Sequence, residues 1–249
     1  MKNLKTNILG LRFDNITMDE AVSAGKEMLD GCSAGIVVTP NAEIAYEACK
    51  DRTFRELLNG ADLMLPDGAG VILAAKIIKK PLKSKVAGID FATRMLTVFA
   101  EKGTKLFLLG SKPGVAEAAA EKMQKHAPGL QICGTADGYF REEAPVIEKV
   151  NDSGAEALFV CLGAPKQEKF MMAHRDELQT VRLMAGLGGS LDSFAGNVKR
   201  APKWMIRLQL EWLYRLIKEP KRIGRMMRLP KYVLLALKTR IKGGAEWES

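Results

Sequence analysis

Short apolar runs alternate with segments of helical character through the first 198 residues. The apolar runs are rich in Val, Ile, Leu and Phe, which favours buried strands. Thr17 and Glu20 form a capping box at the start of the first helical segment. The predicted strands are 7–13, 35–39, 61–65, 105–110, 130–134, 157–163 and 181–187, and the predicted helices are 17–30, 41–59, 69–80 and 115–126.

This alternation predicts an α/β fold with a mainly parallel, Rossmann-like sheet that helices cover on both faces. Ligands of such sheets bind beyond the carboxyl ends of the strands. We therefore expect a binding site where the chain leaves the predicted strands. The segments in that position are 39–41, 66–68, 110–114, 163–167 and 186–192.

The pattern changes after residue 198 to that of a basic amphipathic helix, which we expect to break at Pro220 and Pro230. We predict an α/β core over residues 1–198, with two lobes that meet near residue 100, and a helical appendage over residues 199–249. Helical spacing forms two stripes on this appendage. The charged stripe contains Arg207, Glu211 and Arg215, and the apolar stripe contains Trp204, Leu208 and Trp212.

Charge is concentrated in the same appendage. The chain has a formal net charge of +9, and residues 199–249 contain 14 Lys and Arg but only 4 Asp and Glu, so the first 198 residues are nearly neutral. Such a block needs an anionic partner, for which membrane phospholipid, nucleic acid and diphosphate are candidates. Trp204, Trp212 and Tyr214 suit a lipid headgroup interface. We therefore expect an anionic membrane surface and no nucleic acid.

The cysteines and the chain's hydropathy indicate the compartment. Cys32, Cys49, Cys133 and Cys161 are far apart and form no CxxC pair, which indicates reduced and mostly buried thiols. Residues 1–13 do not resemble a signal peptide, and no run approaches the roughly 18 apolar residues that span a bilayer. We expect a cytoplasmic protein that is peripheral on the inner face of the cell membrane.

Three glycine-containing segments are candidates for ligand contact. Gly110–Gly114 lies between a strand and a helix, where backbone N–H groups favour phosphate, although a plain turn explains it slightly better. Lys166 and Gln167 start a helix in the expected cleft or form its solvated first turn. Three glycines within Gly186–Gly189 usually mark the close approach of a ligand or another backbone. Asp192 beyond them could hold a ribose or a base, or cap the helix.

Asp67 is the candidate acid–base group, because a carboxylate at that edge could remove a proton from a bound hydroxyl. Pro-Asp-Gly is also typical turn chemistry, and Asp is a good helix N-cap, so both roles stay open. His126 and His174 lie in different helices without a partner at ligand spacing, and there is no DxD motif. We expect no metal and no other cofactor.

Several segments together resemble the WecG/TagA/CpsF transferases, and the match covers nearly the whole chain in order. Each segment is weakly specific alone, whereas the set is specific. The segments are Thr39–Glu43, Leu65–Val71, Val86–Asp90, Phe107–Ser111, Gly138–Phe140, Gly163–Glu168, Gly186–Gly189, Arg200–Pro202 and Glu211–Arg215.

This resemblance implies a metal-independent, inverting α/β glycosyltransferase that uses a UDP-sugar donor and a polyprenyl-diphosphate-linked GlcNAc acceptor. The TagA branch, which transfers N-acetylmannosamine in wall teichoic acid synthesis, is the closest likeness. By the resemblance, the catalytic residues are Asp67 as base with Thr39 and Gln167. The implied UDP-sugar contacts are Asn41, Gly110, Ser111, Tyr139, Gly163, Lys166, Gly188 and Asp192, and the implied diphosphate and acceptor contacts are Lys85, Arg215, Arg222 and Arg225.

Position 85 departs from the family, which usually has Arg there, so a bidentate phosphate contact is not expected from Lys85. Other functions also stay open from sequence. The donor could be UDP-ManNAcA or UDP-glucose, and the chain could be a membrane-tethered UDP-binding protein without catalysis. A nucleic-acid arm ranks lowest. Exposed apolar residues of the appendage could also form a homo-oligomer interface.

Overall fold

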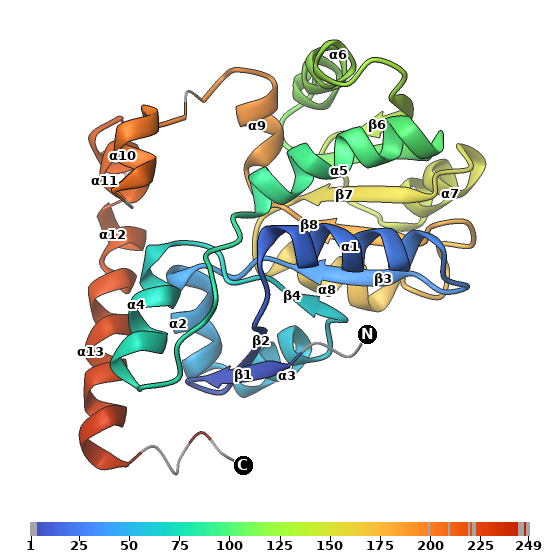
Figure 1. Ribbon diagram of the computed structural model, residues 1–249. Coiled ribbons are helices and arrows are strands. Elements are labelled where there is room, and N and C mark those ends of the chain that lie inside the picture. The colour runs from blue at the N-terminus through green and yellow to red at the C-terminus, as the bar shows by residue number, and fades with distance from the viewer. Residues whose placement is uncertain are drawn as a thin grey trace.

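The computed structural model describes residues 4–198, 200–208, 210–218, 220, 223–243 and 247, and Figure 1 shows their arrangement. The strands are β1 (Lys5–Ile8), β2 (Leu11–Asp14), β3 (Gly35–Val38), β4 (Leu63–Met64), β5 (Lys105–Gly110), β6 (Gln131–Ala136), β7 (Ala157–Cys161) and β8 (Leu183–Gly186). The helices are α1 (Met18–Leu29), α2 (Ala42–Lys50), α3 (Arg52–Asn59), α4 (Ala69–Ile77), α5 (Gly88–Lys102), α6 (Val115–His126), α7 (Ala144–Asp152), α8 (Lys166–Ala173), α9 (Ser190–Phe194), α10 (Lys203–Arg207), α11 (Glu211–Lys218), α12 (Ile223–Met226) and α13 (Arg228–Lys242).

Six strands form one parallel sheet in the order β4-β3-β8-β7-β5-β6, which confirms the predicted α/β fold. Strand β8 lies in the middle, and its Gly186 pairs with Val38 on one side and Val160 on the other. Successive strand residues enter two separate cores, because side chains of a strand alternate between faces. Val38 faces the core built with α2, α3, α4 and α8, whereas Val37 faces the core built with α1, α5 and α6.

The predicted strand over residues 7–13 is wrong, because this segment is the hairpin β1–β2. Ile8 pairs with Leu11, and the two residues between them, Leu9 and Gly10, both have positive φ. That geometry matches a type I′ hairpin turn, for which Asn-Gly is the usual sequence. Leu9 occupies the strained first position, and its side chain is buried in the core. Burial of the Leu9 side chain therefore stabilises a turn that lacks the usual Asn-Gly sequence.

The helix boundaries also differ from the prediction in two places. Residues 41–59 form two helices rather than one, because Asp51 ends α2 in an extended conformation and caps α3 by accepting from Phe54 N at 3.0 Å. The predicted helix over residues 69–80 ends at Ile77. The helices α5 and α7 were absent from the prediction.

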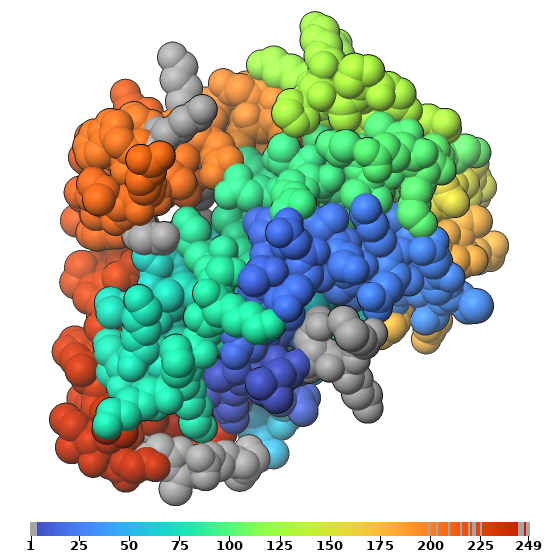
Figure 2. Space-filling view, viewed as in Figure 1, coloured from blue at the N-terminus to red at the C-terminus, as the bar shows by residue number. Residues whose placement is uncertain are grey.

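The C-terminal segment differs from the expected amphipathic helix with breaks at Pro220 and Pro230. The chain turns at Leu208, between α10 and α11, so the two predicted stripes do not lie on one helix. Pro230 does not break α13, because it lies in the first turn, where its missing N–H costs no helical hydrogen bond. Helix α13 packs along α4, as Figure 2 shows, and against α2. The division into a core over residues 1–198 and an appendage over residues 199–249 stays a prediction.

Among the residues described, no helix is both long and apolar enough to cross a membrane.

Candidate functional site

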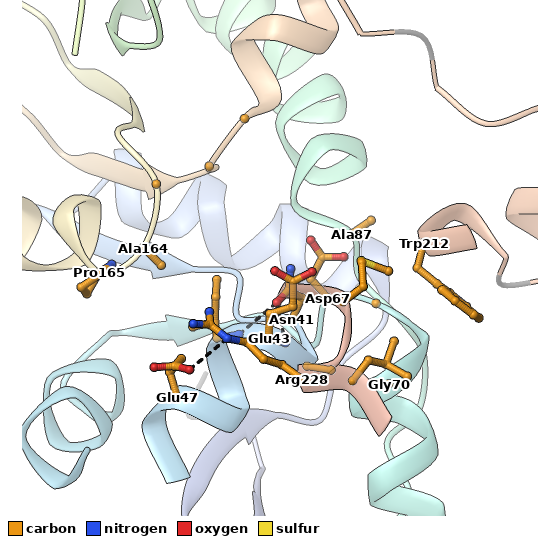
Figure 3. A pocket seen from close by; sticks show the side chains of 18 of the residues that line it. Asn41, Glu43, Glu47, Asp67, Gly70, Ala87, Ala164, Pro165, Trp212 and Arg228 are labelled. Carbon is orange, nitrogen blue, oxygen red and sulfur yellow. Dashed lines mark hydrogen bonds and ion pairs between the residues drawn. The ribbon is translucent and has the colours of Figure 1, made fainter. Parts of the chain in front are cut away.

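A cavity of about 820 Å³ opens at the carboxyl edge of the parallel sheet, where the ligand site is expected. Residues that follow β3, β4, β7 and β8 line one part of it, and residues of the surrounding helices, among them α2, α3, α11 and α13, line the rest. Figure 3 shows Asp67, Asn41 and Glu43 close together in this cavity, with Arg228 beside them. Of the residues implied by sequence, Asn41, Asp67, Lys85, Gly163, Gly188 and Asp192 line the cavity.

Asp67 reaches the cavity from the loop between β4 and α4. It is not the N-cap of α4, because Gly68 holds that position and makes no side-chain cap. Instead, Asp67 Oδ2 accepts from Gly88 N, the first amide of α5, at 3.3 Å. The N-terminus of a helix carries partial positive charge, so this contact favours the ionised carboxylate. A charged carboxylate in a cavity wall has the chemistry of a general base.

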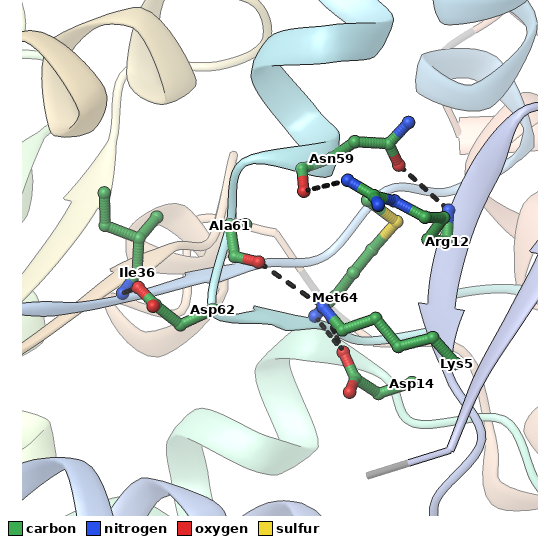
Figure 4. Close-up of polar contacts among 8 residues, drawn as sticks. All are labelled: Lys5, Arg12, Asp14, Ile36, Asn59, Ala61, Asp62 and Met64. Carbon is green, nitrogen blue, oxygen red and sulfur yellow. Dashed lines mark hydrogen bonds and ion pairs between the residues drawn. The ribbon is translucent and has the colours of Figure 1, made fainter. Parts of the chain in front are cut away.

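The short strand β4, which leads to Asp67, depends on side chains of neighbouring elements. Figure 4 shows the buried Asp14 of the hairpin accepting from Met64 N of β4 at 2.8 Å. Lys5 lies 3.5 Å from the same carboxylate oxygen. Asp62, just before β4, accepts from Ile36 N of β3 at 2.8 Å. The hairpin therefore holds the strand from which the Asp67 loop starts.

Thr39 and Asn41 follow β3 and have different roles in the architecture. Thr39 is buried and donates from Oγ1 to Gly186 O at 2.9 Å, which joins the ends of β3 and β8. Asn41 caps α2, with its Oδ1 accepting from Glu43 N at 2.9 Å and Ile44 N at 3.1 Å. The cap uses the oxygen of the Asn41 amide, so its nitrogen is the atom suited to donate to a ligand.

Gln167 is buried rather than part of a solvated turn, and it does not line the cavity. Its Oε1 accepts from Gly188 N at 2.9 Å, and its Nε2 donates to Glu168 Oε1 at 2.8 Å. Gln167 is 2% exposed and Glu168 is 1% exposed. Burial raises the pKa of Glu168 against the opposing effect of the hydrogen bond from Gln167. The amide oxygen of Gln167 thus holds the glycine loop after β8, and its nitrogen is held by Glu168 of the same helix.

The turn after β5, one of the candidate segments for ligand contact, is joined to α9. Ser111 donates from Oγ to Asp192 Oδ2 at 2.9 Å, and Asp192 lies inside α9, so it is not the cap of this helix. Gly110 has a φ of 129°, and a Cβ at this position would lie 2.3 Å from the Cys161 carbonyl oxygen. The close backbone of β7 therefore requires glycine here. Gly110 and Ser111 lie behind Asp192 and do not line the cavity.

Lys166 and Tyr139 lie outside the cavity lining. Lys166 Nζ donates to Gly138 O at 3.1 Å and lies 4.1 Å from the centroid of the Phe140 ring. Tyr139 is 68% exposed. Lys166 therefore anchors the loop after β6, and Tyr139 projects from this loop toward solvent.

Carboxylates outnumber cations in the described cavity wall, which poses a problem for any diphosphate ligand. The cations are Lys85, Lys169 and Arg228, and the carboxylates are Glu43, Glu47, Asp51, Asp67, Asp192 and Glu211. Of the three arginines implied by sequence, Arg222 lies outside the described residues. Arg215 and Arg225 lie in α11 and α12, but their side chains are not described.

The prediction from sequence did not include the cavity wall built by α2 and α13. Arg228 Nε lies 3.0 Å from Glu47 Oε1 and joins the two helices across the cavity. Glu43 and Glu47 are four residues apart, which places them on the face of α2 that Asn41 begins. That spacing could have identified the acidic wall. The ion pair with Arg228 spans most of the chain and has no local sequence signature.

Within the described part of the chain, no group of three or more His, Cys, Asp or Glu residues is placed to hold a metal ion. His174 instead contacts Glu143 at 2.7 Å and Glu177 at 3.1 Å. Burial would lower the pKa of His174, but the hydrogen bonds to both glutamates outweigh it and raise the pKa. His174 therefore belongs to a salt-bridge cluster away from the cavity.

Comparison with known proteins gives one consistent result. The sequence model of the family described as "Glycosyl transferase WecG/TagA/CpsF family" matches residues 6–246. A protein of Bacillus spizizenii is 41% identical over 210 residues, which cover 84% of this chain and 81% of that protein. A protein of Staphylococcus aureus is 34% identical over 240 residues, which cover 96% of this chain and 94% of that protein. Both are named N-acetylglucosaminyldiphosphoundecaprenol N-acetyl-beta-D-mannosaminyltransferase.

Proposed function

Because the chain belongs to the WecG/TagA/CpsF family of glycosyl transferases, we propose that it transfers N-acetylmannosamine to GlcNAc-diphospho-undecaprenol. The chain is an enzyme of the glycosyltransferase class. The observation that carries the proposal is the position of Asp67, whose carboxylate lines the cavity at the carboxyl edge of the sheet. UDP-ManNAc is the proposed donor, and wall teichoic acid is the polymer under construction.

The reaction needs one base and a stabilised leaving group. Asp67 takes the proton from the acceptor hydroxyl while the hydroxyl oxygen bonds to the anomeric carbon of ManNAc. The bond between that carbon and the β-phosphate oxygen breaks, and its electron pair leaves with UDP. Attack opposite the leaving group inverts the configuration at the anomeric carbon. The negative charge that develops on UDP must be met by N–H groups and cationic side chains.

The two ends of the cavity suit the two substrates. Gly163, Gly188 and Asp192 lie where the chain leaves β7 and β8, and glycine backbones there permit close approach of UDP. Thr39 and Gln167 support this end through Gly186 and Gly188 rather than by lining the cavity. The acceptor sugar then occupies the end beside Asn41. Lys85 and the arginines at 215, 222 and 225 are the proposed partners of the diphosphates.

The C-terminal helices support a peripheral location on the inner face of the cell membrane. Basic residues near an anionic surface contribute about 1 kcal/mol each to binding. Exposed apolar side chains accompany them, and the same surface is the candidate for a homo-oligomer interface. The most exposed of these side chains are Trp204, Leu208, Ile217, Ile223, Met227, Leu234 and Ile241.

The first test measures UDP release from UDP-ManNAc with and without a GlcNAc-diphospho-lipid acceptor. We expect acceptor-dependent release by the wild type and a loss of at least about a hundredfold in Asp67→Asn, which is the lower range for removal of a general base. Asp152→Asn is the matched control, because Asp152 is an exposed carboxylate at the end of α7.

Parallel reactions with UDP-ManNAcA and UDP-glucose identify the donor. Faster release from either of these would overturn UDP-ManNAc as the donor while preserving the transferase. Binding of UDP without transfer from any donor would instead support a non-catalytic UDP-binding protein. Full activity in Asp67→Asn would remove Asp67 from the role of base.

A further inference from the structure

Arg200 lies in the segment between α9 and α10, and the proposed mechanism gives it no task. Its guanidinium contacts Asp90, in the first turn of α5, through two hydrogen bonds. The Nη1–Oδ1 distance is 2.6 Å, and the Nη2–Oδ2 distance is 3.3 Å. Two parallel N–H contacts with one carboxylate fix the plane of the guanidinium. Arg200 therefore fastens the start of the C-terminal segment to the helix end that also contacts Asp67.

Three carboxylates from three parts of the chain act on Arg200. Burial would lower its pKa, but the hydrogen bonds to Asp90 and the charges of Asp90, Glu211 and Asp67 outweigh burial and raise it. Asp90 belongs to α5, Glu211 is the first residue of α11, and Asp67 belongs to the loop before α4. Arg200 is thus within electrostatic reach of both the candidate base and the helix that carries Glu211 into the cavity wall.

The end of α5 presents an electrostatic conflict that Arg200 resolves. Asp67 accepts from Gly88 N, and Asp90 lies two residues farther along the same first turn. Two carboxylates near one helix end repel each other. A cation close to both offsets this repulsion. Arg also stays protonated at any relevant pH, and its planar guanidinium can contact a carboxylate through two N–H groups at once.

We propose that Arg200 is the positioning residue of Asp67, and this inference rests on the proposed transferase function. Arg200 holds the Asp67 carboxylate in place against the α5 end. Because the charge of Glu211 also acts on Arg200, the position of Asp67 depends on whether α11 is packed against the core. Glu211 and Trp212 both line the cavity, so a seated α11 completes the wall at the same time as the base is set.

Kinetics of four variants test this role. In Arg200→Ala we expect kcat for acceptor-dependent UDP release to fall at least about tenfold, with the donor KM within about twofold of wild type. Arg200→Lys regains part of kcat, because it restores the positive charge but not the two parallel N–H donors of the guanidinium. Asp90→Asn loses less than Arg200→Ala, because the positive charge of Arg200 still acts on Asp67 and Glu211. Arg94→Ala is the control, because Arg94 is on α5 but pairs with Asp19.

Two kinetic results would overturn the proposal. Unchanged kcat in Arg200→Ala would show that Asp67 needs no such partner. Equal losses in Asp90→Asn and Arg200→Ala, with no recovery in Arg200→Lys, would reduce Arg200 to a tether between the C-terminal segment and α5.

Hydrogen exchange gives a second readout that does not depend on catalysis. Amides of α11 should exchange faster in Arg200→Ala than in wild type, and Arg94→Ala should leave them unchanged. If the wild type shows no acceptor-dependent release but α11 still loosens in Arg200→Ala, the proposed function fails and the coupling through Arg200 stands. If the wild type transfers sugar and neither kcat nor exchange responds to Arg200→Ala, the inference about Arg200 fails.

Discussion

Gln167 shows how a buried amide can shape a binding site without lining it. Its carbonyl oxygen holds Gly188 N, and Gly188 lines the cavity. Its nitrogen donates to Glu168, which fixes the orientation of the amide. A side chain that contacted only the substrate would leave stability unchanged when removed. The network around Gln167 instead links the geometry of the glycine loop to the free energy of folding.

Removal of this amide should therefore be visible in the apo protein. We expect Gln167→Ala to lower the free energy of unfolding by about 1–3 kcal/mol, because Gly188 N and the buried Glu168 carboxyl lose their partner. Urea denaturation measures the change. Gln179→Ala is the control, because Gln179 is exposed, and its effect should stay within about 0.5 kcal/mol. Equal stability of the two variants would contradict the supporting role of Gln167.

The sequence indicates where the candidate site lies better than it indicates how side chains act there. Asp67, Asn41 and Gly188 follow strands, and parallel strands bring their carboxyl ends to one edge. Their convergence therefore follows from the strand pattern alone. The pairs Arg200–Asp90 and Arg228–Glu47 join residues more than a hundred positions apart. These pairs form only because the C-terminal segment packs on the core.

At the scale of elements, the elements with clear local signals were predicted, and those whose structure depends on tertiary contacts were not. Strands β3, β7 and β8 are buried along their whole length, so their apolar runs identify them as strands of a covered sheet. The hairpin turn at Leu9 and Gly10 lacks the usual turn residues. Helix α5 begins at Gly88, and its N-cap residue Ala87 has no side chain that can cap it, so the usual start signal is missing. Asp67 instead supplies a contact from a distant loop.

His174 connects two helices and should make stability depend on pH. It ends α8 and contacts Glu143, which precedes α7, as well as Glu177. The pKa of His174 is raised in the folded state, so its contribution is fully present below the unfolded value, near 6.5, and is lost as pH rises through the folded value. We expect His174→Gln to lower Tm more at pH 5.5 than at pH 8.5.

Thermal unfolding of both proteins at the two pH values measures this difference. His126→Gln is the matched control, because His126 is exposed at the end of α6. A Tm difference for His174→Gln that is the same at both pH values would show that the imidazole acts by packing on Phe170 rather than by charge.

At the scale of the whole molecule, the C-terminal segment has two parts with different relations to the core. Helices α10 and α11 carry exposed Trp204 and line the cavity through Glu211. Helix α13 belongs to the hydrophobic core, where Tyr232 and Ala236 are fully buried against α2 and α4. Deleting residues from 199 onward would remove both parts, so lost transfer in such a deletion would not distinguish an active-site role from unfolding.

Substitutions on the two faces of α13 separate these possibilities. Tyr232→Ala should lower the free energy of unfolding by about 3–5 kcal/mol, as for other large aromatic side chains removed from a core. Leu234→Ala is the matched control, because Leu234 is exposed on the same helix, and we expect a change within about 0.5 kcal/mol. Urea denaturation of both variants measures the difference. If Tyr232→Ala were as stable as Leu234→Ala, α13 would not contribute to the stability of the core. Residues from 199 onward could then be deleted without disturbing the sheet.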